Sequence, residues 1–102
     1  MKIPFIAERM LICAEDPQQK VIVRLARPKL NAKAKDYECV YQIRGKGVNL
    51  TRSAAGLDAM QALQLAFTMI GAEIDRIEKT SGIHLRFGDL ENSGFPSINR
   101  TH

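Results

Sequence analysis

The sequence predicts one α+β domain with two layers, in which an antiparallel sheet carries a single long helix across one face. Two patterns lead to this class. Apolar residues alternate with a period of two through most of residues 6–52, as in strands, and recur at spacings of three and four over residues 60–77, as in a helix. A length of 102 residues, with 45% hydrophobic and 25% charged content, is typical of one globular domain. We therefore expect residues 1–102 to form a single domain.

The first two expected strands begin a meander. Alternation over residues 6–15 predicts the first strand, and Asp16 and Pro17 are expected to end it in a turn. Residues 20–27 alternate again and stop at Pro28, which predicts the second strand.

Two further strands are expected before the helix. Residues 29–35 (KLNAKAK) have no clear period and are expected to form an exposed basic loop. Alternation returns over residues 36–44 and again over residues 48–52. The Gly-Lys-Gly run at 45–47 that separates them is typical of a β-hairpin connection.

One amphipathic helix is expected from Asp58 to Ser81. Asp58 is a good N-cap, and Gln61 lies three residues on, at the spacing of a capping box. Gly82 can close the helix in the left-handed conformation. We expect the helix start to be more buried than its end, and Gly71 to let a strand or a second helix approach closely. The predicted apolar stripe comprises Met60, Leu63, Phe67, Ile70, Ile74 and Ile77.

A last short strand is expected at residues 83–87, which gives the element order β-β-β-β-α-β and a sheet of four or five strands. Residues 89–102 have the Gly, Asn, Ser and Pro content of a surface loop. The expected ordered core therefore covers about residues 3–88. In the tail, Phe95 is the one residue expected to be anchored.

The net charge of +4 is unevenly distributed along the chain. Residues 1–52 contain eleven Lys and Arg against five Asp and Glu, whereas residues 53–102 contain four against six. A basic surface can attract nucleic acid, anionic lipid or an acidic protein. The candidate contacts for nucleic acid or another anion are Lys29, Lys33, Lys35, Arg44, Lys46 and Arg52. In the strands, Arg9, Arg24 and Arg44 are expected to contribute to a positive outer face or rim of the sheet.

Base stacking has little support in the sequence. Tyr37 and Tyr41 share one face of their strand with Cys39 and Ile43 and are expected in the core. An RNA-binding sheet normally exposes aromatic residues that stack on bases. Nucleic-acid binding is therefore the weaker of the binding hypotheses.

No combination of residues predicts catalysis, a metal site or a bound cofactor. The nitrogen and sulfur ligands available for a metal are Cys13, Cys39, His84 and His102, and no two of them are close in sequence. Cys39 and His84 are the enzymatic alternative, because both could lie on the sheet as a nucleophile and its base. However, a cysteine on an alternating apolar face is typical of a core residue. We expect a protein that is not an enzyme.

The expected location is the cytoplasm, with no membrane association. The first fifteen residues are interrupted by Pro4, Glu8 and Arg9 and lack the continuous apolar core of a signal peptide. The apolar helical stretch at residues 59–72 is too short to span a bilayer. Both cysteines lie in apolar segments, as is typical of reduced, buried thiols.

Several short motifs resemble a family of small uncharacterised bacterial proteins. That family has a G-x-D-x-x-Q-A-L helix start and a C-terminal G-F-P loop. The matching segments are GLDAMQALQLA at 56–66, LRFGD at 85–89, GFP at 94–96, IAER at 6–9 and YEC at 37–39. The resemblance covers most of the chain. It implies a compact α+β domain from a bacterium and brings no activity or functional residue with it.

The sequence favours a non-enzymatic protein-interaction module that binds a protein partner or another copy of itself. The observations behind this hypothesis are the missing catalytic constellation and a helix whose apolar face is wider than one stripe. An immunity-like role is an analogy of size and architecture. The alternative is nucleic-acid or anionic-ligand binding through the basic first half.

Overall fold

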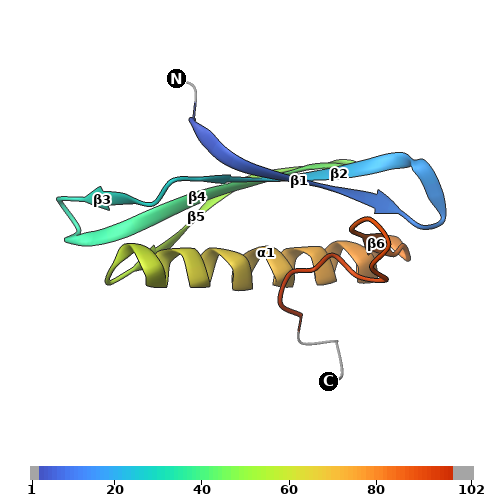
Figure 1. Cartoon of the computed structure of the whole chain (residues 1–102). Helices are drawn as coiled ribbons and strands as arrows, with labels where there is room; N and C mark the ends of the chain where they lie inside the picture. The colour runs from blue at the N-terminus through green and yellow to red at the C-terminus, as the bar shows by residue number, and fades with distance from the viewer. Residues whose placement is uncertain (1–2, 98–102) are drawn as a thin grey trace.

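The computed structural model describes residues 3–97 and has two layers, a sheet and one helix (Figure 1). It confirms the predicted α+β class, with a six-stranded sheet rather than one of four or five strands. In chain order the elements are β1 (Phe5–Cys13), β2 (Asp16–Ala26), β3 (Lys29–Asn31), β4 (Asp36–Gly45), β5 (Val48–Gly56), α1 (Ala59–Ser81) and β6 (Leu85–Arg86).

Strand β4 pairs with three other strands, and every pairing among the described strands is antiparallel. On one edge β4 pairs with β5 along its whole length. On its other edge it pairs with the short β3 near one end and with β2 near the other. The sheet continues from β2 to β1 and then to β6. The long strands therefore follow one another as a meander, as predicted.

Two connections differ from the prediction. Residues 29–35 are not all loop, because Lys29–Asn31 pair with β4 as strand β3. The turn that follows is stabilised by the Asn31 side chain, whose Oδ1 accepts the N–H groups of Lys33 (3.1 Å) and Ala34 (3.2 Å). This side-chain turn allows a short hairpin that hydrophobic periodicity does not reveal.

The first turn lies two residues earlier than predicted. Cys13 pairs with Asp16, so Ala14 and Glu15 form the turn and β2 begins at Asp16. Pro17 is therefore a strand residue near the end of the hairpin, a place where a strand tolerates a proline.

The predicted β4–β5 hairpin is present. Its two-residue loop consists of Lys46 (φ 52°) and Gly47 (φ 80°), and two positive φ angles are typical of a type I′ turn. Gly45 precedes the loop, and a Cβ there would overlap the Lys20 carbonyl oxygen of β2. The glycine is needed because two strands approach closely at this point.

Both ends of α1 are capped by side-chain or backbone groups. Asp58 Oδ1 accepts the N–H of Gln61 at 2.7 Å, and Gln61 Oε1 accepts the N–H of Leu57 at 2.6 Å. At the other end Gly82 has φ 66°, and its N–H donates to the Glu78 carbonyl at 2.9 Å. Helix α1, the helix found in residues 3–97, is not long and apolar enough to span a membrane.

The first half of α1 turns a different face to the sheet than the predicted stripe. Ala62 and Ala66 are fully buried there, whereas Met60 is 66% and Phe67 38% exposed. The prediction was wrong because the small alanines let the helix lie close to β5, where a Cβ on Gly56 would overlap the backbone of Ala62. Large side chains are fully buried only from Ile70 onward. The start of the helix is therefore not its more buried end, contrary to the prediction. The stripe holds for Ile70, Ile74 and Ile77, which are buried, and Leu63 packs against the core from a half-buried position.

The core lies between the sheet and α1. Tyr41 is fully buried, as the alternation predicts, and Tyr37 packs against the core from a half-buried position. Cys13 and Cys39 are buried and free. Burial raises the pKa of the Cys39 thiol, so this group stays protonated and is a poor nucleophile.

The C-terminal loop packs against α1 and β1. Phe95 is 6% exposed, and its ring centroid lies 6.2 Å from that of Phe67, which confirms the expected anchor. A Cβ on Gly71 would overlap the Pro96 carbonyl oxygen. Gly71 thus permits a close approach, but of this loop and not of a strand or second helix. The rest of the expected tail, residues 98–102 with His102, lies outside the described residues.

Candidate functional site

A groove of about 440 Å³ lies between the sheet and the helix, beside the C-terminal loop. Val23 and Leu25 of β2 line one side together with β1 residues, and Phe67 and Ile70 of α1 line another. Gly94, Phe95 and Pro96 complete the lining. The groove is thus a largely apolar surface that three separate parts of the chain create.

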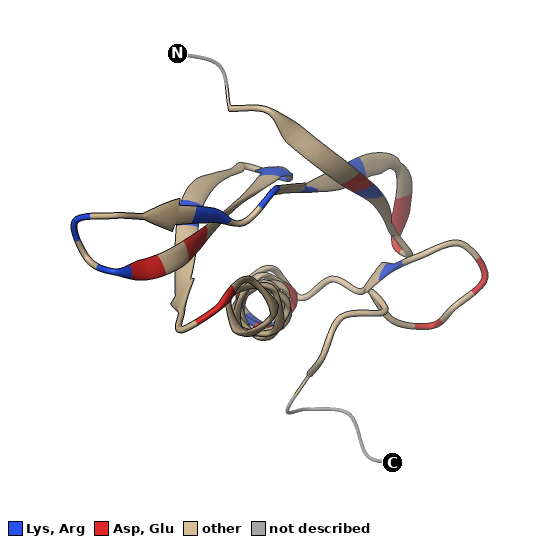
Figure 2. Ribbon diagram, turned by 60° about the vertical axis from the view of Figure 1, so that its left-hand side comes forward, with Lys and Arg blue, Asp and Glu red and all other residues tan. Residues whose placement is uncertain are grey.

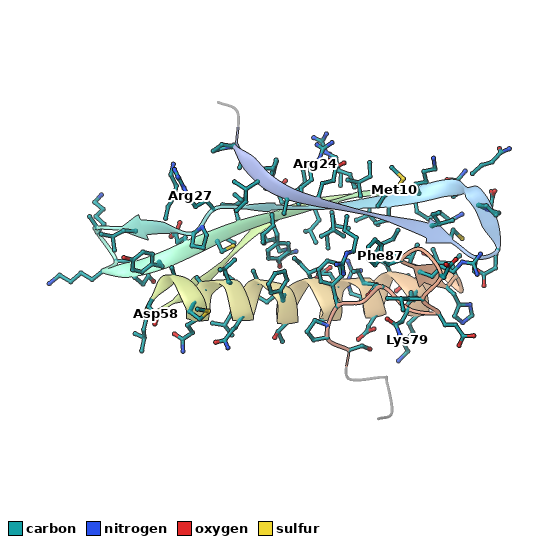
Figure 3. All side chains as sticks on the ribbon, viewed as in Figure 1. Met10, Arg24, Arg27, Asp58, Lys79 and Phe87 are labelled. Carbon is teal, nitrogen blue, oxygen red and sulfur yellow. The ribbon has the colours of Figure 1, made fainter. Side chains whose placement is uncertain are left out.

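Alternation along β1 decides which side chains reach this groove. Ala7 and Arg9 share the inner face with the buried Leu11. Glu8 also borders the groove, but its carboxylate is directed to Arg24 on the outer face, where Met10 lies as well. Figure 3 shows Met10 pointing away from α1, together with Arg24 of β2. Glu8 and Arg24 form an ion pair of 2.7 Å on that outer face.

Arg9 brings a positive charge to the groove. Its Cζ atom lies 4.1 Å from the ring centroid of Phe87 and 4.9 Å from that of Phe95. Aromatic faces attract a guanidinium at such distances. Its Nη1 also donates to the Ser93 carbonyl at 3.3 Å. Within residues 3–97, no carboxylate forms an ion pair with Arg9.

The loop accommodates this guanidinium because residue 94 is glycine. A Cβ on Gly94 would lie 2.7 Å from Arg9 Nη1, and the backbone there has φ +81°. L-residues with a side chain rarely adopt such a φ angle. Gly94 therefore provides both the space and the backbone conformation that the Arg9 position requires.

The edge of β1 beside the groove is open for most of its length. In the described part of the chain, β6 pairs with β1 only at Ile12 and Cys13. The Ala14 N–H donates to the His84 carbonyl at this same edge. Because alternate residues direct their N–H and C=O groups to the same edge, those of Glu8 and Met10 also point to the open side. An unpaired edge of this kind is a template for another strand.

The basic residues proposed as anion contacts do not gather into one patch (Figure 2). Lys33 and Lys35 lie at the β3–β4 turn and Lys46 lies at the β4–β5 turn. These turns are at opposite ends of β4, whose ten residues span about 33 Å at about 3.3 Å per residue. Lys29 belongs to the short edge strand β3.

Two arginines of that set point to opposite faces of the sheet. Arg52 is opposite Tyr41, a core residue, so it lies on the helix side. Arg44 is opposite Ile22, on the outer face. The expectation for Arg9 needs a correction as well, because Arg9 lies on the inner face and adds nothing to a positive outer face.

The alternative nucleophile pair is not formed. Cys39 Sγ is fully buried and lies 3.4 Å from the Ala26 carbonyl oxygen. His84 is exposed and pairs with Glu15 instead. Among residues 3–97, no three His, Cys, Asp or Glu side chains gather closely enough to hold a metal ion.

A Glu15–His84 pair joins the first hairpin to the last strand. Glu15 Oε2 lies 2.6 Å from His84 Nδ1, and Glu15 Oε1 accepts the His84 backbone N–H at 2.9 Å. The hydrogen bond with the His84 side chain is the main cause that lowers the pKa of Glu15 to about 2. The same bond raises the pKa of His84. Sequence reasoning missed this pair because 69 positions separate its members.

The groove was also missed, although one signal was present. Arg9 shares the period-two face of Leu11 and Cys13, and a charge among core residues needs a partner or a polar function. Its partners, Phe87 and Phe95, come from the far end of the chain. No local pattern connects them to β1.

The fold and this site define a small two-layer α+β domain with an apolar groove beside an unpaired strand edge. The chain belongs to the family described as Domain of unknown function (DUF6968), whose model matches residues 7–97. No curated protein and no solved structure matches the chain. The family assignment agrees with the expected likeness to uncharacterised proteins. The bacterial origin stays a prediction.

Proposed function

We propose that this domain is a non-enzymatic protein-interaction module. An extended segment of a partner pairs with the open edge of β1 and places side chains in the groove. The main observation behind the proposal is that the unpaired edge of β1 lies directly beside an apolar groove. In recognition by strand addition, main-chain hydrogen bonds supply affinity and adjacent pockets select alternate side chains.

The groove has dimensions that suit this mode. Its volume of about 440 Å³ lies within the range of about 300–1,000 Å³ seen for ligand pockets. Because successive side chains of a strand point to opposite faces, only every second residue of an added strand reaches the groove. We therefore expect the bound segment to carry apolar residues at alternate positions.

The proposal extends to the cellular location and to the kind of partner. Free, buried Cys13 and Cys39 support a reducing, cytoplasmic environment.

A separate protein is the proposed partner, and self-association through the same edge of β1 is the alternative. Light scattering over a range of protein concentrations separates the two, because a mass that stays at one chain contradicts self-association.

Selection from a library of random linear peptides tests the proposal. We expect enriched peptides with alternating apolar residues, and we expect Ala7→Trp to weaken their binding at least tenfold by filling the groove. Ile6→Trp is the matched control, since Ile6 is the adjacent residue, is 62% exposed and does not line the groove. Peptides that bind the Ala7→Trp variant as tightly as the original domain, or no enrichment at all, would contradict the proposal.

A further inference from the structure

We propose that Arg9 binds the terminal carboxylate of the partner, so that the bound segment is the C-terminal end of a protein chain with apolar last residues. This inference rests on the proposed function and specifies its ligand. Arg9 provides charge complementarity for a carboxylate in a groove that is otherwise largely apolar. It is then the residue that determines specificity.

The environment of Arg9 prepares its guanidinium for such a ligand. A guanidinium has five N–H donors in a rigid plane, and one of them is used by the Ser93 carbonyl. The rings of Phe87 and Phe95 hold the group in place from the protein side. A carboxylate can accept two parallel hydrogen bonds from an arginine, and such bonds are shorter and stronger than those between neutral groups.

The topology explains why the ligand should end here. A strand added to the open edge of β1 cannot continue past Leu11, because β6 occupies that edge at Ile12 and Cys13. The added segment therefore stops beside Arg9 or Met10. A chain end at this place brings its terminal charge close to Arg9, which attracts a carboxylate and repels an ammonium group.

The direction of the added strand follows from this placement. β1 runs from Phe5 toward Cys13, so a segment whose last residue lies beside Arg9 runs parallel to β1. A parallel pair is slightly less stable per residue than an antiparallel pair. The contact between Arg9 and the carboxylate offsets that difference and selects the parallel direction.

Two peptide libraries of the same random composition test the inference. In one library the random segment ends in a free carboxylate, and in the other a fixed polar spacer follows it. We expect enrichment from the first library only. Each enriched peptide is then synthesised as a free acid and as a C-terminal amide, and fluorescence anisotropy is expected to show at least tenfold tighter binding of the acid by the unaltered domain.

Substitutions of two arginines test whether Arg9 causes the difference in binding between the acid and the amide peptides. Arg9→Gln is expected to remove the difference between acid and amide, and Arg9→Lys to retain part of it, since a lysine keeps the charge without the bidentate geometry. Arg24→Gln is the matched control, because Arg24 is a strand arginine on the outer face. Thermal melts verify that each variant is folded. The comparison of acid and amide on the unaltered domain does not depend on any variant.

The outcomes separate this inference from the proposed function. Equal binding of acid and amide overturns the inference, and the proposed function survives if Ala7→Trp still weakens binding at least tenfold. Enriched peptides from the spacer library that need Arg9 and contain an internal Asp or Glu also overturn it, because the carboxylate is then a side chain. If neither library yields peptides whose binding is weakened by the Ala7→Trp substitution, both proposals are wrong.

Discussion

Gly71 determines how closely the C-terminal loop approaches the helix. Inside a helix a glycine costs about 1 kcal/mol relative to alanine, so its presence needs a structural reason. The reason is the Pro96 carbonyl, which occupies the position that a Cβ would take. Because Phe95 lines the groove and contacts Arg9, this single contact also positions the candidate site.

We expect Gly71→Ala to destabilise the domain by up to about 2 kcal/mol, because forcing a methyl group into a packed region costs about 1–3 kcal/mol and the gain in helix propensity offsets only about 1 kcal/mol of that cost. Urea unfolding followed by circular dichroism measures the change. Ala72→Gly at the next, exposed position is the control and should cost about 1 kcal/mol. A Gly71→Ala variant that is more stable than the original chain would show that the loop does not pack as described.

The element that matters most for the site is β1, since its two edges and two faces have different roles. One edge pairs with β2 from Ala7 to Ile12 without interruption, while the other is open before β6. The inner face contributes to the groove, and the outer face contains the Glu8–Arg24 ion pair. Adjacent residues therefore serve different parts of the structure.

Proline substitutions distinguish the two edges of β1. Glu8→Pro removes an N–H that points to the open edge, so we expect the fold to persist and the binding of selected peptides to fall at least tenfold. Ala7→Pro removes an N–H directed to β2 and should unfold or strongly destabilise the domain, because a proline inside a ladder removes one of its hydrogen bonds. Circular dichroism and anisotropy give the two measurements. Glu8→Ala controls for the lost ion pair, and undiminished peptide binding by Glu8→Pro would count against strand addition.

At the scale of the whole molecule, the Glu15–His84 pair connects the first hairpin to the strand that follows the helix. The pKa of Glu15 is lowered from 4.5 to about 2, so its contribution to stability is complete above about pH 4.5 and is lost as the pH falls toward 2. The pKa of His84 is raised above 6.5 by Glu15 and, more weakly, by Glu78, so its contribution is complete below pH 6.5 and is lost at higher pH.

We therefore expect the stability difference between the unaltered chain and Glu15→Gln to be largest between about pH 4.5 and 6.5 and to decrease on both sides. Urea unfolding at a series of pH values measures it. Glu91→Gln, a substitution of an exposed loop carboxylate, should give no such maximum. A difference that does not change with pH would mean that the pair does not form in solution.

Much of the fold was predictable because its signals are local. Period-two alternation gave the long strands, period 3.6 gave the helix, and Asp58, Gln61 and Gly82 marked its ends. The prediction was wrong where a short-range hydrogen bond or a close approach overrides periodicity. Asn31 creates the β3–β4 turn by its side chain, and the helix buries Ala62 and Ala66 in place of the larger Met60 and Phe67.

The candidate site could not be predicted in the same way. The contacts of Arg9 with Phe87 and Phe95 join the two ends of the chain. The open edge of β1 depends on where β6 stops. Neither feature has a period or a fixed spacing. The one signal of the site in the sequence is an arginine, Arg9, on an otherwise apolar face of a strand.

The two-layer class, the order of the main elements and the capped ends of the helix can be predicted from local patterns, because hydrophobic alternation and capping act over a few neighbouring residues. The buried face of the helix, the open strand edge and the positions of the basic residues are set by the packing of the folded chain. Those features depend on distances between segments that are remote in the chain, and residue spacing alone does not fix such distances.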